Sequence, residues 1–270
     1  MSGSLQTIQY RLSSSSTKLV PLSKNLVDQV RSYPGRSDGP ILAHPLKFAG
    51  NTTATKLTQI RAVLDKRARN GWVYVLPTLP AVAWLLNFRC PGDIPYCPVA
   101  YAYLVFTQDK CAIFVDSRKL DDGIRAIWSK DNIEVKDYGV DEVGKYVKDQ
   151  VKAIQDGHEK KRITVFASKE CSWALSNACS PVSSLPSNGV ILMIQSEVEI
   201  IQPSPVDVIK GVKNNTEIEG ARNAYLRDGR AMVRWMAWLE QKILRDARPV
   251  GEWVAAQGLL RYRKLEENFA

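Results

Sequence analysis

The chain has 270 residues, of which 45% are hydrophobic and 24% are charged. These fractions are typical of a folded globular protein and exclude a largely disordered chain. No stretch approaches the roughly 18 consecutive apolar residues that a membrane-spanning helix needs. The serine-rich residues 1–16 lack the apolar core of a signal peptide. We therefore expect a soluble, cytoplasmic protein without a membrane partner.

Charge and cysteine usage narrow the range of partners. Clustered Lys and Arg would favour nucleic acid, but Asp and Glu interrupt the positive residues behind the net charge of +9, so a nucleic-acid partner is not expected. The five cysteines are odd in number and irregularly spaced, which indicates a reducing compartment. Their spacing fits no zinc motif, and only His44 and His158 are available as histidine ligands.

The first fifty residues change character several times. A short amphipathic stretch at 5–12 precedes four consecutive serines, and we expect a helix at 24–31. Proline and glycine then recur as far as Pro45, as they do in turns and linkers. This punctuation indicates the end of one domain and a connection to the next.

Helical and strand-like patterns alternate from residue 54 onward. Apolar residues at helical spacing predict a helix that stops at Asn70-Gly71, and the apolar run 72–76 predicts a buried strand. Pro80 can open the next helix. The strand-like runs 100–107 and 111–116 are close enough to form an antiparallel hairpin.

The same alternation continues toward the C-terminus. Helices are expected at 121–129, 141–154 and 172–178, and strands at 133–138, 162–167 and, singly or as a pair, 190–194 and 198–200. Strand–helix alternation with one hairpin predicts an α/β fold, a mixed sheet flanked by helices.

Two helices are predicted after Pro205. The first spans about 216–247 with Asn215 or Thr216 as its cap, and the second follows Pro249. Both have apolar faces that the upstream α/β unit alone would have to cover. We therefore expect that a larger domain is cut off at this end, and that these helices favour self-association.

Three segments resemble one enzyme family in the correct order. They are KLVPLSKNLVDQV (18–30), AWLLNFRCPGDIPYCPVAYAYLVF (83–106) and IKGVKNNTEIEGARNAYLRDGRAMVRWMAWLE (209–240). Together they are similar to cytosolic aminopeptidase P, a three-domain Xaa-Pro aminopeptidase. The resemblance implies a first-domain remnant and linker at 1–45, a creatinase/prolidase N-terminal-like middle domain at 46–204, and the first two helices of a truncated pita-bread catalytic domain at 205–270.

The resemblance also implies a function and a cofactor. The family enzyme is a metallopeptidase that releases the residue preceding proline and holds two divalent metals, manganese or zinc, through aspartates, a histidine and glutamates downstream of the entry helix. This chain ends before those positions, so we expect no catalytic residue, no metal ligand and no activity in it, but a structural and substrate-access role. The alternative is a non-catalytic protein-binding or nucleic-acid-binding module, as in an aminopeptidase P-like histone chaperone.

One proline-bounded loop holds the candidate site residues. Arg89, Asp93 and Tyr96 could overhang the active site of a complete enzyme and contact its substrate, or an internal Arg89–Asp93 ion pair could pin the turn, which is the reading we favour. Family members usually carry a more compact sequence here, whereas Cys90-Pro91 adds a residue and a proline.

Other conspicuous residues are expected to be structural. Asp116 follows a strand and fits a turn or a helix cap better than a carboxylate site. Cys171 and Cys179 are expected to be small buried side chains. Core or interface packing, rather than ligand stacking, is expected for four tryptophans at helical spacing, namely Trp84, Trp235, Trp238 and Trp253.

Overall fold

The computed structural model describes residues 39–68, 70–156, 163–168, 170–180, 196–246 and 249–269, together with scattered residues among the first 37. The chain divides into two compact units. Unit 1 comprises Met1–Pro45 and Asn51–Val212, and unit 2 comprises Leu46–Gly50 and Lys213–Ala270. None of the helices in the described residues is both long and apolar enough to cross a bilayer.

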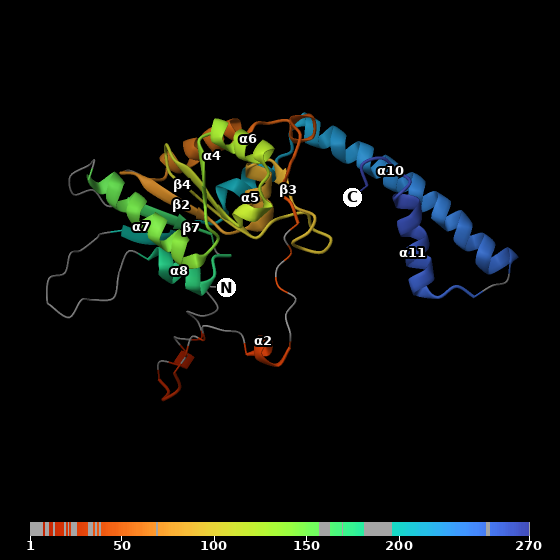
Figure 1. The fold of residues 1–270 in the computed structure, drawn as a ribbon, viewed down its shortest axis with the longest axis horizontal. Coiled ribbons are helices and arrows are strands. Elements are labelled where there is room, and N and C mark those ends of the chain that lie inside the picture. The colour runs from red at the N-terminus through yellow and green to blue at the C-terminus, as the bar shows by residue number, and fades with distance from the viewer. Residues whose placement is uncertain are drawn as a thin grey trace. The chain divides into compact units, whose positions relative to one another are not determined.

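A six-stranded mixed sheet forms the centre of unit 1 (Figure 1). Its spatial order is β6-β5-β4-β2-β7-β8. The strands are β2 (Trp72–Leu76), β4 (Ala102–Phe106), β5 (Cys111–Val115), β6 (Ile133–Lys136), β7 (Ile163–Ala167) and β8 (Ser196–Ile200). Only β4 runs antiparallel to its neighbours, and it forms the predicted hairpin with β5. The other pairs in this sheet are parallel, which confirms the expected mixed sheet.

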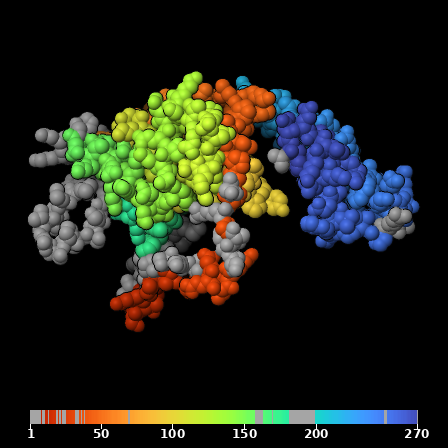
Figure 2. Space-filling model, in the orientation of Figure 1, coloured from red at the N-terminus to blue at the C-terminus, as the bar shows by residue number. Residues whose placement is uncertain are grey.

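Helices cover both faces of the sheet (Figure 1). Along β2, Trp72, Tyr74 and Leu76 belong to one core, whereas Val73 and Val75 belong to the other. This alternation follows from the two-residue period of a strand. The first core includes residues of α4 (Thr53–Asp65), α5 (Leu79–Leu85), α6 (Asp122–Lys130) and α9 (Pro205–Gly211). The second includes residues of α7 (Val140–Asp156) and α8 (Trp173–Cys179). In the space-filling view, α7 lies at the surface of unit 1 in green (Figure 2).

A buried lysine of α4, Lys56, joins this helix to α5 and to the residues that follow α5. Lys56 is only 1% exposed, and its Nζ donates hydrogen bonds to the carbonyl oxygen of Trp84 and to Oδ1 of Asn87, both at 2.7 Å. The ammonium also lies 4.3 Å from the centroid of the Trp84 ring. Trp84 therefore has the packing role expected for it. Next to it, β3 (Phe88–Arg89) pairs with the short strand β1 (Leu42–Ala43).

Unit 2 is a helical hairpin with one short helix beside it. It contains α3 (Leu46–Ala49), α10 (Asn215–Glu240), a π-helical turn at Gln241–Arg245 and α11 (Glu252–Arg263). Trp235 donates from Nε1 to the carbonyl oxygen of Ala255 at 2.7 Å, and the Trp238 ring lies against Gly258. These two tryptophans pack as expected. Trp253 is 74% exposed, so packing in the core of unit 2 is wrong for it, and packing at an interface stays a prediction.

Several predicted boundaries differ from the structure. Asn214, rather than Asn215 or Thr216, caps α10, because its side chain and that of Glu217 form a reciprocal capping box. In the region of the helix predicted at 24–31, the structure has the shorter α2 (Val27–Val30). The short helix α9 was not predicted, although Pro205 is well placed to begin it. The expected strand at 190–194 lies outside the described residues.

The contact between α7 and α8 depends on a glycine. A Cβ on Gly144 would lie 2.7 Å from the carbonyl oxygen of Ala178, whereas a Cβ on Gly220 in α10 would meet no atom within 4 Å. We predict that Gly144→Ala lowers the free energy of unfolding by about 1–2 kcal/mol, since overpacking outweighs the gain in helix propensity. Gly220→Ala should raise it by about 0.5–1 kcal/mol. Urea denaturation checks both, and equal gains would contradict the tight contact.

Candidate functional site

The carboxyl ends of five strands meet at one edge of the sheet. Since β4 alone is reversed, β2, β5, β6, β7 and β8 all point the same way. Asp116, Asp137 and Ser168 directly follow β5, β6 and β7, and Tyr101 precedes β4 at the same edge. Ligands of open α/β sheets bind at this edge, outside the carboxyl ends of the strands. This edge is therefore the candidate ligand-binding edge of unit 1.

The loop at residues 89–98 contains all three predicted site residues. Its ends are joined by a hydrogen bond from the Cys90 amide to the Pro98 carbonyl at 3.0 Å, and Ile94 and Cys97 form an isolated antiparallel bridge. Tyr96 lies at the tip with its side chain fully exposed and a φ of 63°. A positive φ is unfavourable for a tyrosine and persists only where the surrounding structure fixes it.

A buried ion pair fixes the loop from below. Lys119 donates from Nζ to Oδ1 of Asp93, and the Tyr101 amide donates to Oδ2 at 2.9 Å. The side chains of Asp93 and Lys119 are 0% and 3% exposed. The favoured Arg89–Asp93 pair is thus wrong: Asp93 pairs with Lys119, whereas Arg89 donates from Nη1 to the Phe88 carbonyl at 2.8 Å.

Sequence reasoning missed Lys119, and no local signal marks it. Asp93 and Lys119 are separated by 26 positions and meet only because η1 (Ser117–Lys119) follows β5 at the sheet edge. A buried carboxylate requires a partner, so the existence of a pair was foreseeable. Its identity required the fold.

Asp116 has the capping role predicted for it. Its carboxylate accepts from the Arg118 amide at 3.1 Å and caps η1. The Arg118 guanidinium also donates to this carboxylate, and these bonds lower the pKa of Asp116 to about 2. The carboxylate therefore remains charged near neutral pH, and the amide and guanidinium of Arg118 fix its position.

The two cysteines near α8 are buried, as predicted. Cys171 is 0% exposed and Cys179 is 1% exposed. Burial raises the pKa of Cys171 to about 11 and that of Cys179 to about 12. Because the thiolate is the nucleophilic form, both thiols are unreactive near neutral pH.

Metal-ligating side chains do not gather in the described part of the chain. No group of three or more His, Cys, Asp or Glu residues there has a geometry that could hold a metal ion. Two carboxylates near this edge, Asp93 of the loop and Asp116, already have cationic partners, Lys119 and Arg118 respectively. The described residues therefore do not fit a two-metal centre.

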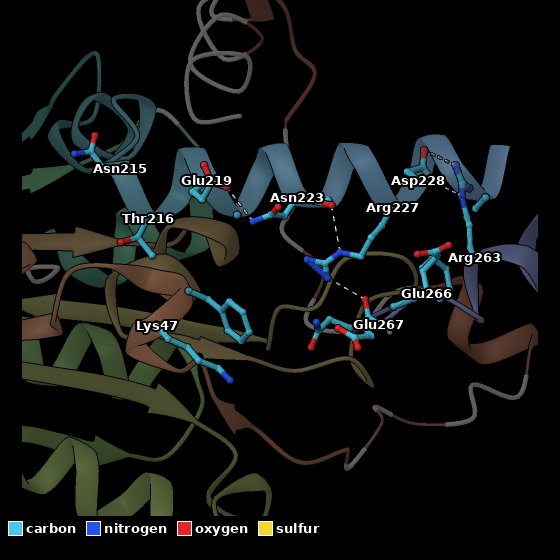
Figure 3. Close-up of a pocket in the computed structure, with 16 residues that line it drawn as sticks. Lys47, Asn215, Thr216, Glu219, Asn223, Arg227, Asp228, Arg263, Glu266 and Glu267 are labelled. Carbon is cyan, nitrogen blue, oxygen red and sulfur yellow. Dashed lines mark hydrogen bonds and ion pairs between the residues drawn. The ribbon is translucent and has the colours of Figure 1, made fainter. Parts of the chain in front are cut away.

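A cavity of about 730 Å³ lies within unit 2 (Figure 3). Residues of α3, α10 and the C-terminal stretch 263–269 line it. Arg263 holds Asp228 through two hydrogen bonds at 2.6 and 3.2 Å. Arg230 and Arg234 both donate to the Glu266 carboxylate, at 2.6 and 3.2 Å. Sequence reasoning did not find this cavity, because its α3 wall lies about 165 to 220 positions along the chain from the other two walls.

The buried ion pair leads to a test of the loop. We predict that Lys119→Met lowers the free energy of unfolding by about 3–5 kcal/mol, because it leaves the Asp93 charge buried without a partner. Adding Asp93→Asn should recover part of this loss. Asp116→Asn is the matched control, and its pair with the exposed Arg118 should contribute less than about 1 kcal/mol. Urea denaturation measures all of these variants, and strictly additive losses would contradict the pairing.

Comparisons with known proteins agree on one family. The family described as "Creatinase/Prolidase N-terminal domain" matches residues 32–217. A probable Xaa-Pro aminopeptidase P of Pyricularia oryzae is 34% identical over 255 residues, which is 93% of this chain and 38% of that protein. Aminopeptidase P1 of Arabidopsis thaliana is 30% identical over 239 residues, 84% of this chain and 35% of that protein.

A solved structure extends the match to nearly the whole chain. It is the X-prolyl aminopeptidase of Caenorhabditis elegans, described as a cytosolic enzyme with a di-nuclear active site. The TM-score is 0.83 at 28% identity, over 99% of this chain and 40% of that one. This chain thus spans about two fifths of the length of the relatives it matches. It belongs to the creatinase/prolidase N-terminal domain family, in which these relatives are aminopeptidases of the Xaa-Pro type.

Proposed function

We propose that the chain forms part of an Xaa-Pro aminopeptidase, a hydrolase that releases the residue preceding proline. The observation that carries this proposal is the alignment of 93% of the chain with a probable Xaa-Pro aminopeptidase P at 34% identity. The cores on both sheet faces and the hairpin of unit 2 support a scaffold role for the chain in that enzyme. Its substrates in the complete enzyme would be proline-containing peptides, and its location would be cytoplasmic.

Within that enzyme, the loop at 89–98 would limit the access of peptide substrates to the active site. Arg89 and Tyr96 are the residues that would lie beside the peptide, while the buried Asp93 would hold the loop in place. Two observations on Tyr96 support this role: its φ is positive, which is unfavourable for a tyrosine, and its ring is fully exposed. Unfavourable backbone angles of this kind are concentrated at functional sites.

The complete enzyme would hold two divalent cations, manganese or zinc. Paired cations activate a bridging water for hydrolysis. The C. elegans relative is described as having a di-nuclear active site. In this chain the described residues contribute scaffold and loop to such an enzyme, and not a metal centre.

A hydrolysis assay tests the proposal. We expect the 270-residue chain to leave Ala-Pro-Ala uncleaved in manganese or zinc and to bind neither metal stoichiometrically. A chimaera that continues the chain with the unmatched part of the P. oryzae relative should cleave the peptide in a chelator-sensitive reaction. The P. oryzae protein itself is the positive control. A folded, metal-loaded chimaera without turnover would overturn the proposed function, and turnover by the chain alone would overturn its scaffold role.

We also propose that the hairpin of unit 2 promotes self-association. Large apolar side chains are exposed on its helices, among them Tyr225, Leu226, Val233, Met236, Trp253 and Val254. Exposed apolar surface of this kind marks interaction surfaces. Such surface would pair with a second copy of the chain when nothing else covers it.

Shortening the chain tests this second proposal. A chain that ends at Val212 keeps α9, whose Val206 is fully buried in the core of unit 1, and removes both long helices. We expect light scattering to show a mass closer to the monomer than for the full chain at the same concentration. Leu226→Glu with Val233→Glu should act in the same direction, whereas Arg222→Gln should not. An unchanged mass in both shortened and substituted chains would refute the proposal.

A further inference from the structure

We propose that the cavity in unit 2 binds a small apolar molecule that carries a carboxylate. Nothing in the proposed peptidase role requires this site, so the two proposals stand or fall separately. The whole cavity lies within one compact unit, between α3, α10 and residues 263–269. Its volume of about 730 Å³ is within the range of small-molecule sites in proteins, about 300–1,000 Å³.

The apolar part of the cavity comes from two aromatic rings and a small floor residue. Phe48 and Phe269 line the cavity and are 40% and 43% exposed, while Ala231 is fully buried. Covering a phenyl ring with an apolar ligand favours binding, because apolar surface is removed from water. An aryl or branched aliphatic group of modest size matches this lining.

The polar part of the cavity is centred on Arg227. This side chain extends from α10 into the cavity (Figure 3). Its Nε donates to the Asn223 carbonyl and its Nη1 to the Glu267 carbonyl, both at 3.2 Å. A guanidinium has five N–H donors, so three remain. No carboxylate among the described residues pairs with Arg227, in contrast to Arg230, Arg234 and Arg263.

Charge in and around the cavity favours an anion. Its acidic lining residues are largely committed, with Asp228 on Arg263, Glu266 on two arginines and Glu219 near Arg222. The lining cations are Lys47, Arg227 and Arg263, and Arg230 and Arg234 add two more through Glu266, so five cations accompany four acidic lining residues, namely Glu219, Asp228, Glu266 and Glu267. A carboxylate would satisfy the remaining guanidinium donors in the bidentate geometry that arginine prefers.

Hydrogen bonds hold the cavity walls in place. Asn214 donates from Nδ2 to the Ala49 carbonyl at 2.9 Å, which ties α3 to the start of α10. The ion pairs of Asp228 and Glu266 hold the C-terminal stretch against α10. A preformed site loses little conformational entropy when a ligand binds. The cavity therefore does not depend on a closing motion.

Matched ligands test the proposal on the full chain. Isothermal titration calorimetry with 2-naphthoate should show binding at one site per chain. The isosteric neutral 2-naphthamide should bind roughly tenfold more weakly, because it lacks the charge-assisted hydrogen bonds to Arg227. Naphthamide that binds as tightly as naphthoate would overturn the role of the carboxylate.

Matched variants locate the site. Arg227→Gln should weaken naphthoate binding to the level of naphthamide, and Arg227→Lys should give an intermediate affinity. Ala231→Leu should weaken both ligands by filling the floor of the cavity. Arg222→Gln removes one charge from the same helix outside the cavity and should change the affinity less than twofold. Equal losses for Arg222→Gln and Arg227→Gln would reduce the effect to general attraction by a basic chain and overturn the proposal.

Discussion

The central sheet of unit 1 must be covered by apolar side chains on both faces, and this constraint determines much of the fold. β2 lies between β4 and β7, and all five of its residues are buried. Its alternate side chains enter two different cores, so the helices have to be distributed over both faces. A slip of one residue would exchange these two sets, and the bulky Trp72 and Tyr74 would enter the core built around Val73 and Val75.

The reversed strand β4 links this constraint to the candidate site. An antiparallel strand returns through a short turn, whereas a parallel one requires a crossover. Because β4 alone is antiparallel to its neighbours, the other five strands of the sheet end at one edge. At that edge, η1 places Lys119 next to the loop at 89–98. A buried ion pair contributes less to stability than its Coulomb energy suggests, because both charges lose their hydration. The pair of Lys119 with Asp93 is better understood as fixing one position of the loop.

Much of unit 1 could be predicted from sequence because its signals are local. The apolar runs that became β2 and β5 and the helical periodicity of α4 and α7 each fall within a short window. The site depends on distant pairs, and the partner of Asp93 could not be chosen from sequence among many basic residues. The cap of α10 was missed by one position, since Asn214 and Asn215 are equivalent in a propensity argument and differ only in the capping box with Glu217.

In unit 2, several charged side chains have partners, whereas many large apolar side chains remain exposed. Toward the cavity, arginines of α10 and α11 neutralise Asp228 and Glu266, and the indole of Trp235 has a carbonyl partner. Elsewhere on the hairpin, aliphatic and aromatic side chains such as Leu226 remain exposed to water. Polar contacts fix the geometry of a helix pair, but burial of apolar surface supplies most of the free energy of folding. The hairpin thus combines a defined internal geometry with exposed apolar surface.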